Sequence, residues 1–512
     1  MPKWVDIRWQ PDLDCSWEVA PGALTRCRGV VPTRKGVYST FAVETEIASY
    51  TSSTIPLIGT ITRKADGTAR FFIFNKQSIY EFTDPSTGVD RSVGGGYSAS
   101  TTDWTWTQFG DTTIATNYYN PVQYSSAGAF AGLAGSPPKA QLIASNMGFV
   151  MLANIDDGTA KPDGWACCDI EDITDWTPTA TNQADSGRLY DTPGPIRALE
   201  PLRDSIVAYK DDSIYIAEYL GDLANGIIWQ WRLISDKVGA SSAHGVCRVN
   251  DAHYFIHRSG FYVFDGAAVR KIGRECTNFL FNTDYGLEVE PDTAQVCYDS
   301  TENIVCFTWA ATAVFGRDAQ AFYNVETGKW SNSFGYTFTL GTSAQMAAGE
   351  SYSSGIVKAS TSDMIAFDAT IPTDTPSALL IGRLGSAISV YAFAYNAKGT
   401  ETSVTVEIQT GGVGNGVDTL RLGCVRPRLT SFTVGTTPTA TFFADNNEMN
   451  VTYNSAGPPE TQDTSKTAEW SSTHLQFNGS VAGKFVGARM FYTDCEMEIG
   501  GIYLNLSAAG SR

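Results

Sequence analysis

The chain has 512 residues, more than one compact hydrophobic core usually holds, so several cores or one closed repetitive architecture are expected. Hydrophobic residues make up 43% of the sequence and aromatic residues 12%, which excludes disorder as the default state. The formal net charge of −18 argues against a surface built mainly to bind nucleic-acid phosphates.

The residue types favour strands and turns. The sequence contains 48 Gly, 26 Phe, 23 Tyr and 12 Trp, together with many Thr and Ser. Aromatic and β-branched side chains suit pleated, half-buried strands, and Gly suits the tight turns between them. No convincing amphipathic helix longer than three turns is found. The composition therefore predicts an all-β protein.

The first forty residues differ in charge from the rest. They carry six basic and four acidic side chains, so this segment has a charge of +2 and the remainder −20. The basic residues are Lys3, Arg8, Arg26, Arg28, Arg34 and Lys35. The asymmetry is either a docking segment for another subunit or ordinary surface variation. We take residues 1–30 as an N-terminal docking segment and the six basic side chains as the candidate interface.

The cysteines and the N-terminus bear on the cellular compartment. Ten cysteines are scattered without zinc-site spacing and are expected to be small core residues. The N-terminus lacks the order of a signal peptide, and no window approaches the length of an apolar membrane span. We therefore expect folding in a reducing cytoplasm and no insertion of the chain into a membrane.

A recurring hairpin pattern predicts the fold of the first two thirds of the chain. An apolar stretch, a polar turn and a second apolar stretch occur at 71–82, 206–217, 254–264 and 304–323, with a fainter copy at 364–367. The second strands are 135, 47, 61 and 43 residues apart, which fits repeats of about 40–50 residues. The pattern predicts a β-propeller over residues 31–370, with about seven blades and six or eight as alternatives.

A change in pattern follows the predicted propeller. Pro372, Asp374 and Pro376 interrupt the strands, and Ser403–Ile408 then alternates apolar and polar residues as a strand with one solvated face does. Residues 371–512 are therefore expected to form a separate, sandwich-like C-terminal β domain.

The sequence offers little for catalysis. Of the four histidines, His253 and His257 are the closest pair, but a strand would separate them by ~13 Å, too far to share a metal. The acidic group Asp169, Glu171, Asp172 and Asp175 could supply a calcium site or paired glycosidase carboxylates, yet its turn-rich context favours a solvated loop. We expect no enzyme activity, cofactor or metal.

Two Trp-x-Trp pairs are the other candidate site residues. Trp104 with Trp106, and Trp229 with Trp231, each place both rings on one face of a strand. Exposed rings could stack on sugars or bases, whereas rings inside strand-like segments usually pack in the core. Core packing is the expected role.

Several short motifs resemble those of the tail nozzle proteins of podoviruses, also called tail hub or packaged-DNA stabilisation proteins. The resemblance spans most of residues 30–505, and one departure from the family pattern is Trp165-Ala166-Cys167-Cys168, where a Trp-Ser pair is expected. The motifs, in chain order, are Trp104–Asn117 with Pro121 and Gln123, Gly135–Ala140, Trp176, Gly194-Pro195-Ile196, Tyr209-Lys210, Ser213-Ile214-Tyr215, Tyr219–Gly221, Gly260–Gly266 with Ile272-Gly273, Gly487-Ala488-Arg489 and Ile499–Leu504.

The resemblance implies a structural virion protein without catalytic residues. Six copies would form the distal tube below a portal and an adaptor ring, with tail fibres or spikes attached nearby. Double-stranded DNA would pass through the lumen without tight binding and be retained until infection. The protein would be assembled in the host cytoplasm and located in the virion tail. The alternative function is a carbohydrate-binding or carbohydrate-cleaving propeller, which would place exposed aromatic residues and paired carboxylates at the propeller axis.

Overall fold

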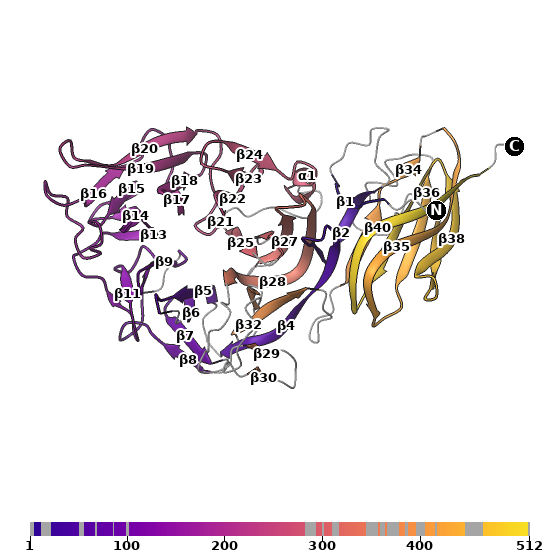
Figure 1. Cartoon of the computed structure of the whole chain (residues 1–512), viewed down its shortest axis with the longest axis horizontal. Coiled ribbons are helices and arrows are strands. Elements are labelled where there is room, and N and C mark those ends of the chain that lie inside the picture. The colour runs from indigo at the N-terminus through magenta and orange to yellow at the C-terminus, as the bar shows by residue number, and fades with distance from the viewer. Residues whose placement is uncertain are drawn as a thin grey trace.

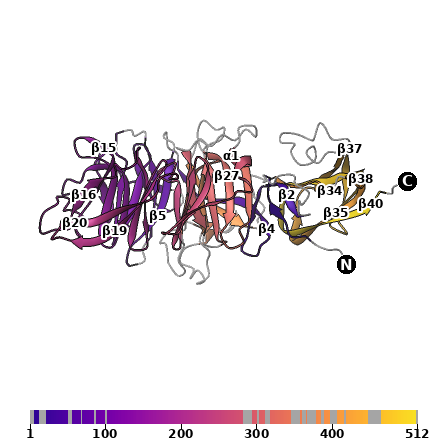
Figure 2. The same cartoon turned by 90° about the horizontal axis from the view of Figure 1, so that it is seen from above.

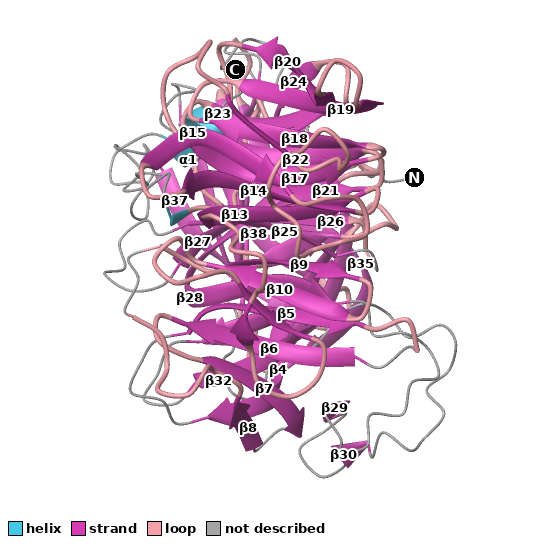
Figure 3. Cartoon of the chain, turned by 90° about the vertical axis from the view of Figure 1, so that its left-hand side faces the viewer, coloured by secondary structure: helices cyan, strands magenta, loops and turns pink. Residues whose placement is uncertain are grey.

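A computed structural model describes most of the chain. The described residues are 5–11, 22–50, 56–66, 69–84, 87–98, 102–281, 293–299, 302–309, 317–344, 357–358, 364–365, 378–383, 388–395, 405–414, 417–445 and 464–509. Strands dominate this part of the chain, and its one α-helix is the short α1 (Thr277–Phe281) (Figure 3). The predicted all-β class is confirmed.

Five four-stranded antiparallel sheets follow one another along the chain, and we call them blades 1 to 5. Blade 1 consists of β5 (Pro56–Arg63), β6 (Ala69–Asn75), β7 (Ile79–Asp84) and β8 (Thr87–Asp90). Blade 2 consists of β9 (Thr105–Phe109), β10 (Thr112–Thr116), β11 (Gln123–Ser125) and β12 (Ala131–Gly132). Blade 3 consists of β13 (Lys139–Asn146), β14 (Phe149–Asp156), β15 (Ala160–Cys167) and β16 (Asp185–Arg188). Blade 4 consists of β17 (Ile196–Leu202), β18 (Ser205–Lys210), β19 (Ile214–Asp222) and β20 (Ile227–Ser235). Blade 5 consists of β21 (Val246–Val249), β22 (Ala252–His257), β23 (Gly260–Phe264) and β24 (Val269–Ile272).

Two further blades complete the ring, and they share one long strand. Blade 6 consists of β25 (Gln295–Asp299), β26 (Ile304–Trp309), β27 (Arg317–Asn324) and the first half of β28 (Trp330–Ala344). Blade 7 consists of the second half of β28, β31 (Ala378–Arg383), β32 (Ile388–Tyr395) and β4 (Tyr38–Tyr50). β4, from the start of the chain, thus closes the ring. Closure protects the sheet edges, so no helices are needed to cover them.

The first strands of successive blades lie next to one another around the axis, and β28 contacts β5 at the closure (Figure 1). Hydrophobic clusters fill the spaces between neighbouring blades. One packs blade 3 on blade 4, for example Phe149 on Trp229, and another packs blade 4 on blade 5, for example Tyr209 on Phe255. Blade 4 therefore buries both faces against its neighbours. The seven blades in the described residues confirm the predicted propeller.

A β-sandwich lies beside the propeller (Figures 1 and 2). One sheet has the order β3 (Val30–Pro32), start of β4, β40 (Cys495–Ala508), β35 (Leu420–Val434), β38 (Gln476–Gly483) and the end of β37 (Thr464–Ser471). The other has the order β1 (Arg8–Trp9), β2 (Ala23–Arg28), β33 (Val406–Thr410), β39 (Phe485–Tyr492), β36 (Thr439–Asp445) and the start of β37, with β34 (Val413–Gly414) also paired to β39. The predicted sandwich-like C-terminal domain is confirmed.

The residue ranges of the domains differ from the predicted ones. Residues 378–395 pair with β28 and β4, so the boundary placed at residue 370 falls before two strands of blade 7. Residues 22–32 pair as sandwich strands, so the predicted segment 1–30 is not a separate unit. The fainter hairpin copy also differs, because β30 (Met364–Ile365) pairs only with β29 (Val357–Lys358) in a two-stranded sheet of the described residues. Pairing between residues distant in sequence decides all three cases.

The cysteines in the described residues are all free thiols, and most are buried. Burial raises the pKa of the Cys168 thiol to about 12, which makes this group an inert core side chain. The expectation of small core cysteines is confirmed for this part of the chain.

Candidate functional site

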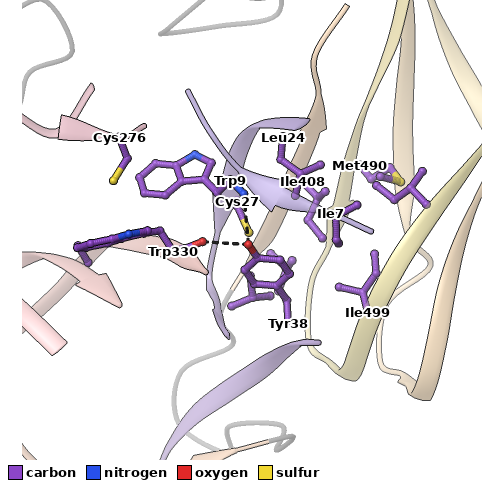
Figure 4. Packing of buried hydrophobic residues seen from close by; sticks show 14 of the residues in the cluster. Ile7, Trp9, Leu24, Cys27, Tyr38, Cys276, Trp330, Ile408, Met490 and Ile499 are labelled. Carbon is purple, nitrogen blue, oxygen red and sulfur yellow. Dashed lines mark hydrogen bonds between the residues drawn. The ribbon is translucent and has the colours of Figure 1, made fainter. Parts of the chain in front are cut away.

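The N-terminal strands β1 and β2 lie between the propeller and the sandwich, and they carry part of the predicted interface (Figures 1 and 4). β2 pairs antiparallel with β33 of the sandwich and meets the propeller strand β28 in parallel at Arg28 and Asn332. β4 pairs with β40 of the sandwich at its start and with β32 of blade 7 at its end. β2 and β4 therefore connect the two domains through backbone hydrogen bonds. We call the region where these two strands meet β28, β33 and β40 the joint.

Aromatic side chains fill the joint. Trp9, Tyr38 and Trp330 are each at most 1% exposed and belong to one cluster that runs from the propeller into the sandwich (Figure 4). The backbone N–H of Trp9 donates to the Tyr38 hydroxyl at 3.2 Å, and that hydroxyl donates to the backbone carbonyl of Trp330 at 3.1 Å. The edge of Phe279 packs on the Trp9 ring at 5.6 Å. Burying one such ring contributes roughly 2–3 kcal/mol, so this contact holds the domains together strongly.

Four of the six candidate interface residues contact carboxylates of the chain itself. Arg26 Nη1 lies 3.1 Å from Glu407 of the sandwich, and Lys35 Nζ lies 3.0 Å from Glu498 of the sandwich. Arg34 instead reaches the propeller, where its Nε lies 3.6 Å from Glu326. Arg8 Nε lies 3.8 Å from Asp6, Arg28 stands on β2 at the contact with β28, and Lys3 lies outside the described residues. Several of these charges therefore serve the joint.

A buried lysine supports the same joint. Lys329 is 4% exposed, and its Nζ lies 2.6 Å from the Asp6 carboxylate and 2.7 Å from the Gly36 carbonyl. The Lys329 ammonium also sits over the Tyr38 ring at 5.5 Å. The sequence analysis missed Lys329 because its partners are about 290 residues or more away in the chain. Its place just before a buried Trp in a strand–turn–Trp unit was the available signal.

His253 is a structural residue. Its ring is 0% exposed, Nδ1 lies 2.8 Å from the Tyr209 hydroxyl and Nε2 lies 3.1 Å from the Pro201 carbonyl. A carbonyl can only accept, so Nε2 carries the proton and Nδ1 accepts from Tyr209. Burial lowers the pKa of His253 to about 4, since the charged ring would be desolvated. The ring ties blade 4 to blade 5.

His257 has partners that the sequence analysis did not bring together. Its Nδ1 lies 2.7 Å from Ser259 Oγ, and its Nε2 lies 3.1 Å from Asp212 Oδ1. This is a Ser–His–Asp chain, but the Ser259 backbone N–H also points at Nδ1, at 3.2 Å, and Arg258 holds both oxygens of Asp212 at 2.7 and 2.8 Å. Burial lowers the pKa of His257, and hydrogen bonding to Asp212 opposes this shift.

The turns of blades 4 and 5 that carry these groups occupy equivalent positions in neighbouring blades. Successive blades place such turns side by side, which was the signal available in the repeat pattern. Each of these polar groups already has a hydrogen-bond partner within or between the two turns. The arrangement is therefore better explained as a contact that holds two hairpins together than as a nucleophile placed to attack a substrate.

The acidic loop, which we define as Asp169–Asp175, is organised by its own backbone. Asp169 Oδ1 accepts from the Ile170 N–H at 2.8 Å, and Asp172 Oδ1 accepts from the Thr174 N–H at 2.8 Å. Hydrogen bonds from Thr174 lower the pKa of the Asp172 carboxyl, which keeps it ionised. Among the described residues no group of three or more His, Cys, Asp or Glu side chains is placed to hold a metal ion. The backbone hydrogen bonds to Asp169 and Asp172 are those of a turn-rich loop, as expected from the sequence.

A carbohydrate-binding propeller would need exposed aromatic rings at the propeller axis. Trp106 of β9 stacks on Phe74 of blade 1 at 5.5 Å and on His244, which precedes blade 5, at 5.6 Å. Blades 2 and 5 are not neighbours, so the contact with His244 crosses the interior of the ring. The Trp106 ring is therefore half-buried and stacked against two side chains of the chain itself. Trp229 and Trp231 likewise pack on blade 3, as expected for core residues.

Residues that carry the family resemblance tie neighbouring blades together. Trp104 Nε1 of blade 2 donates to the Asn75 carbonyl of blade 1 at 2.9 Å. Lys210 Nζ of blade 4 donates to the Leu189 carbonyl that follows blade 3, and Gly273 lies against Trp330 of blade 6, where an added Cβ would come within 2.7 Å of the ring. These motif positions are framework positions.

Comparison with known proteins assigns no family. No protein-family profile matches the chain, and no curated protein matches it. Among solved structures, YCF48 from Cyanidioschyzon merolae has a TM-score of 0.39 at 8% identity and covers 67% of this chain and 97% of its own. A structure described as YCF48 bound to D1 peptide has a TM-score of 0.35 at 10% identity, covering 69% and 94%. A structure of YjhT has a TM-score of 0.35 at 10% identity, covering 56% and 99%. No helix of the described residues is long and apolar enough to cross a membrane.

Proposed function

We propose that this chain is a structural subunit of the tail of a short-tailed bacteriophage, and that its copies form the distal nozzle. The proposal rests mainly on the structural role of the residues that resemble the nozzle family. The residues that resemble the nozzle family, Trp104, Lys210 and Gly273 among them, lie at contacts between blades. Motif residues placed at contacts between blades suit a protein whose function lies in its rigid shape and not in a reactive site.

The joint supports a mechanical role. A tube that holds packaged DNA needs subunits whose domains keep their relative position, and two strands with a shared aromatic cluster join propeller and sandwich here. The axis of a single propeller is crossed by Trp106 and His244, so DNA would pass between copies and not through one ring. The charge of −18 per copy would repel phosphates and keep friction in the lumen low.

In this proposal the protein is not an enzyme and uses no cofactor. Its partners are further copies of itself, six by family resemblance, an adaptor ring, and tail fibres or spikes, with DNA as a transient occupant of the lumen. It is assembled in the host cytoplasm and resides in the virion tail.

The proposal is tested in phage particles made with and without this chain. We expect mass spectrometry of purified virions to find the chain, and particles lacking it to lose packaged DNA and infectivity. Supplying the chain in trans should restore both. Particles that keep their DNA and infect normally without the chain would refute the proposal.

A further inference from the structure

The outer face of one sandwich sheet carries a row of arginines. Along β35 the side chains alternate, so Leu422 and Val425 are buried in the sandwich while Arg421, Arg426 and Arg428 are exposed. β35 is a central strand of this sheet, because β40 and β38 pair with it on either side. We call these three residues the arginine row. Cα atoms two residues apart along a strand are ~7 Å apart, so Arg426 and Arg428 act together.

The residues that lie opposite the three arginines on β40 carry no formal charge. Tyr503 lies opposite Arg426, and Asn505 of β40 and Asn478 of β38 lie opposite Cys424, which sits between the arginines on the same strand. Arg421 Nε donates to Ser480 Oγ at 2.8 Å, which holds this guanidinium against the sheet. The result is a flat, cationic sheet face on a chain that carries an overall charge of −18.

A complementary charge lies in blade 3, in the acidic loop. Residues 162–187 contain six acidic and no basic side chains, and four of the acidic residues belong to the acidic loop. Glu171 and Asp172 of that loop are exposed. Backbone N–H groups hold the carboxylates of Asp169, Asp172 and Asp175 in place, so little side-chain freedom is lost when a cation binds.

We propose that the arginine row of one copy docks on the acidic loop of a second copy. The inference rests on the proposed function, which requires copies to associate. Copies that each carry −18 repel one another, so a stable contact needs cationic groups set against carboxylates. Because the two surfaces lie on different domains, the contact is head-to-tail and can repeat from copy to copy. Arginine suits it, since its planar guanidinium binds carboxylates in bidentate fashion.

Charge favours this occupant over duplex DNA. Three arginines could contact phosphates, but DNA approaching the face would meet the field of the whole acidic chain, whereas the acidic loop offers a compact complementary patch. If the arginine row bound DNA instead, reversing its charge would weaken DNA binding and leave self-association unchanged.

The test measures self-association of the full chain by sedimentation velocity at low and at physiological salt. The row-reversed variant carries Arg421→Glu, Arg426→Glu and Arg428→Glu. The loop-reversed variant carries Asp169→Lys, Glu171→Lys and Asp172→Lys. The control for the row-reversed variant carries the same change in net charge, −6, on exposed propeller arginines, Arg232→Glu, Arg248→Glu and Arg270→Glu. The control for the loop-reversed variant carries the same change, +6, on exposed propeller carboxylates, Glu218→Lys, Asp236→Lys and Asp251→Lys. Circular dichroism and the thermal midpoint establish that each variant is folded.

We expect the wild type to associate in a salt-sensitive manner, and each reversed variant to associate at least about tenfold more weakly than its own charge-matched control. A mixture of the row-reversed and loop-reversed variants should recover association in alternating copies, because the Glu row of one variant meets the Lys loop of the other, and the unchanged arginine row of the second meets the unchanged acidic loop of the first. A variant that carries both reversals should recover it, since its two surfaces are again complementary.

Several outcomes would overturn the docking surface while leaving the proposed function to the phage-particle test. Association of the row-reversed variant at wild-type strength would do so, as would a monomeric wild type at every concentration. Loss of duplex-DNA binding in the row-reversed variant, with self-association unchanged, would assign the row to DNA instead. Failure of the double reversal to associate, with the fold intact, would refute the pairing of these two surfaces.

Discussion

His253 is expected to make the stability of the propeller fall as the pH drops below about 6.5. The ring is fully buried, and its pKa in the folded chain is about 4, compared with 6.5 for an unperturbed histidine. Unfolding therefore takes up a proton in the window between these two values. The sign follows from linkage: stability is complete above the unfolded pKa and is lost as the pH falls through the window toward the folded pKa.

The size of the effect follows from the two pKa values. Two-state linkage for this one group gives a loss of roughly 1–2 kcal/mol at about pH 5.5 and roughly 2–3 kcal/mol at about pH 4.5. The physical cause is desolvation, because the protonated ring would carry its charge in a site closed to water. Buried carboxylates add their own pH dependence, so the contribution of His253 must be measured as a difference between variants.

The assay compares urea midpoints across this pH range for the wild type and for His253→Gln, whose amide does not titrate. We expect His253→Gln to be less stable at neutral pH, by about 1 kcal/mol for the altered hydrogen bonds, but to lose less stability on acidification. His474→Gln is the matched control, because His474 is exposed, and it should follow the wild type. If His253→Gln and the wild type lose stability in parallel, the burial argument is wrong.

Three further outcomes are expected. Tyr38→Phe should lower stability by about 1–3 kcal/mol, because it leaves the Trp9 N–H and Trp330 carbonyl unpaired, whereas Tyr190→Phe at a 77% exposed site should not; urea unfolding measures both, and equal midpoints would contradict the joint. Replacing His253 and His257 together by Ala should reduce stability but leave the rate of ester or glycoside hydrolysis the same as in the wild type. A well-folded double variant that lost a reaction measurable in the wild type would show the histidines to be catalytic. Purified protein should bind duplex DNA negligibly at physiological salt in a mobility-shift titration, and tight, steeply salt-dependent binding would contradict the low-friction lumen.

The sequence alone determined the local elements and the class of fold. Hairpins such as 206–217 and 254–264 were readable because their strands are adjacent in the chain and a polar turn separates them. The spacing of 135 residues between two of them predicted three repeat steps, and the structure contains blades 2 and 3 in that interval. Core roles for Trp104 and Trp106 were readable too, because alternation along a strand places both rings on one face.

Only the tertiary structure decided what the ends of the chain do. β4 pairs with β32 across some 340 residues, and β2 pairs with β33 across some 380, so no local pattern could show that the N-terminus closes the propeller and joins the sandwich. The charge of residues 1–40 pointed to a partner, and the described side chains Arg26 and Lys35 find carboxylates within the same chain. Asp212 and His257 meet for a related reason, since turns of neighbouring blades become adjacent only when the ring closes. Periodicity records which faces of a strand are buried, whereas contacts between distant segments depend on how the sheets pack around the axis.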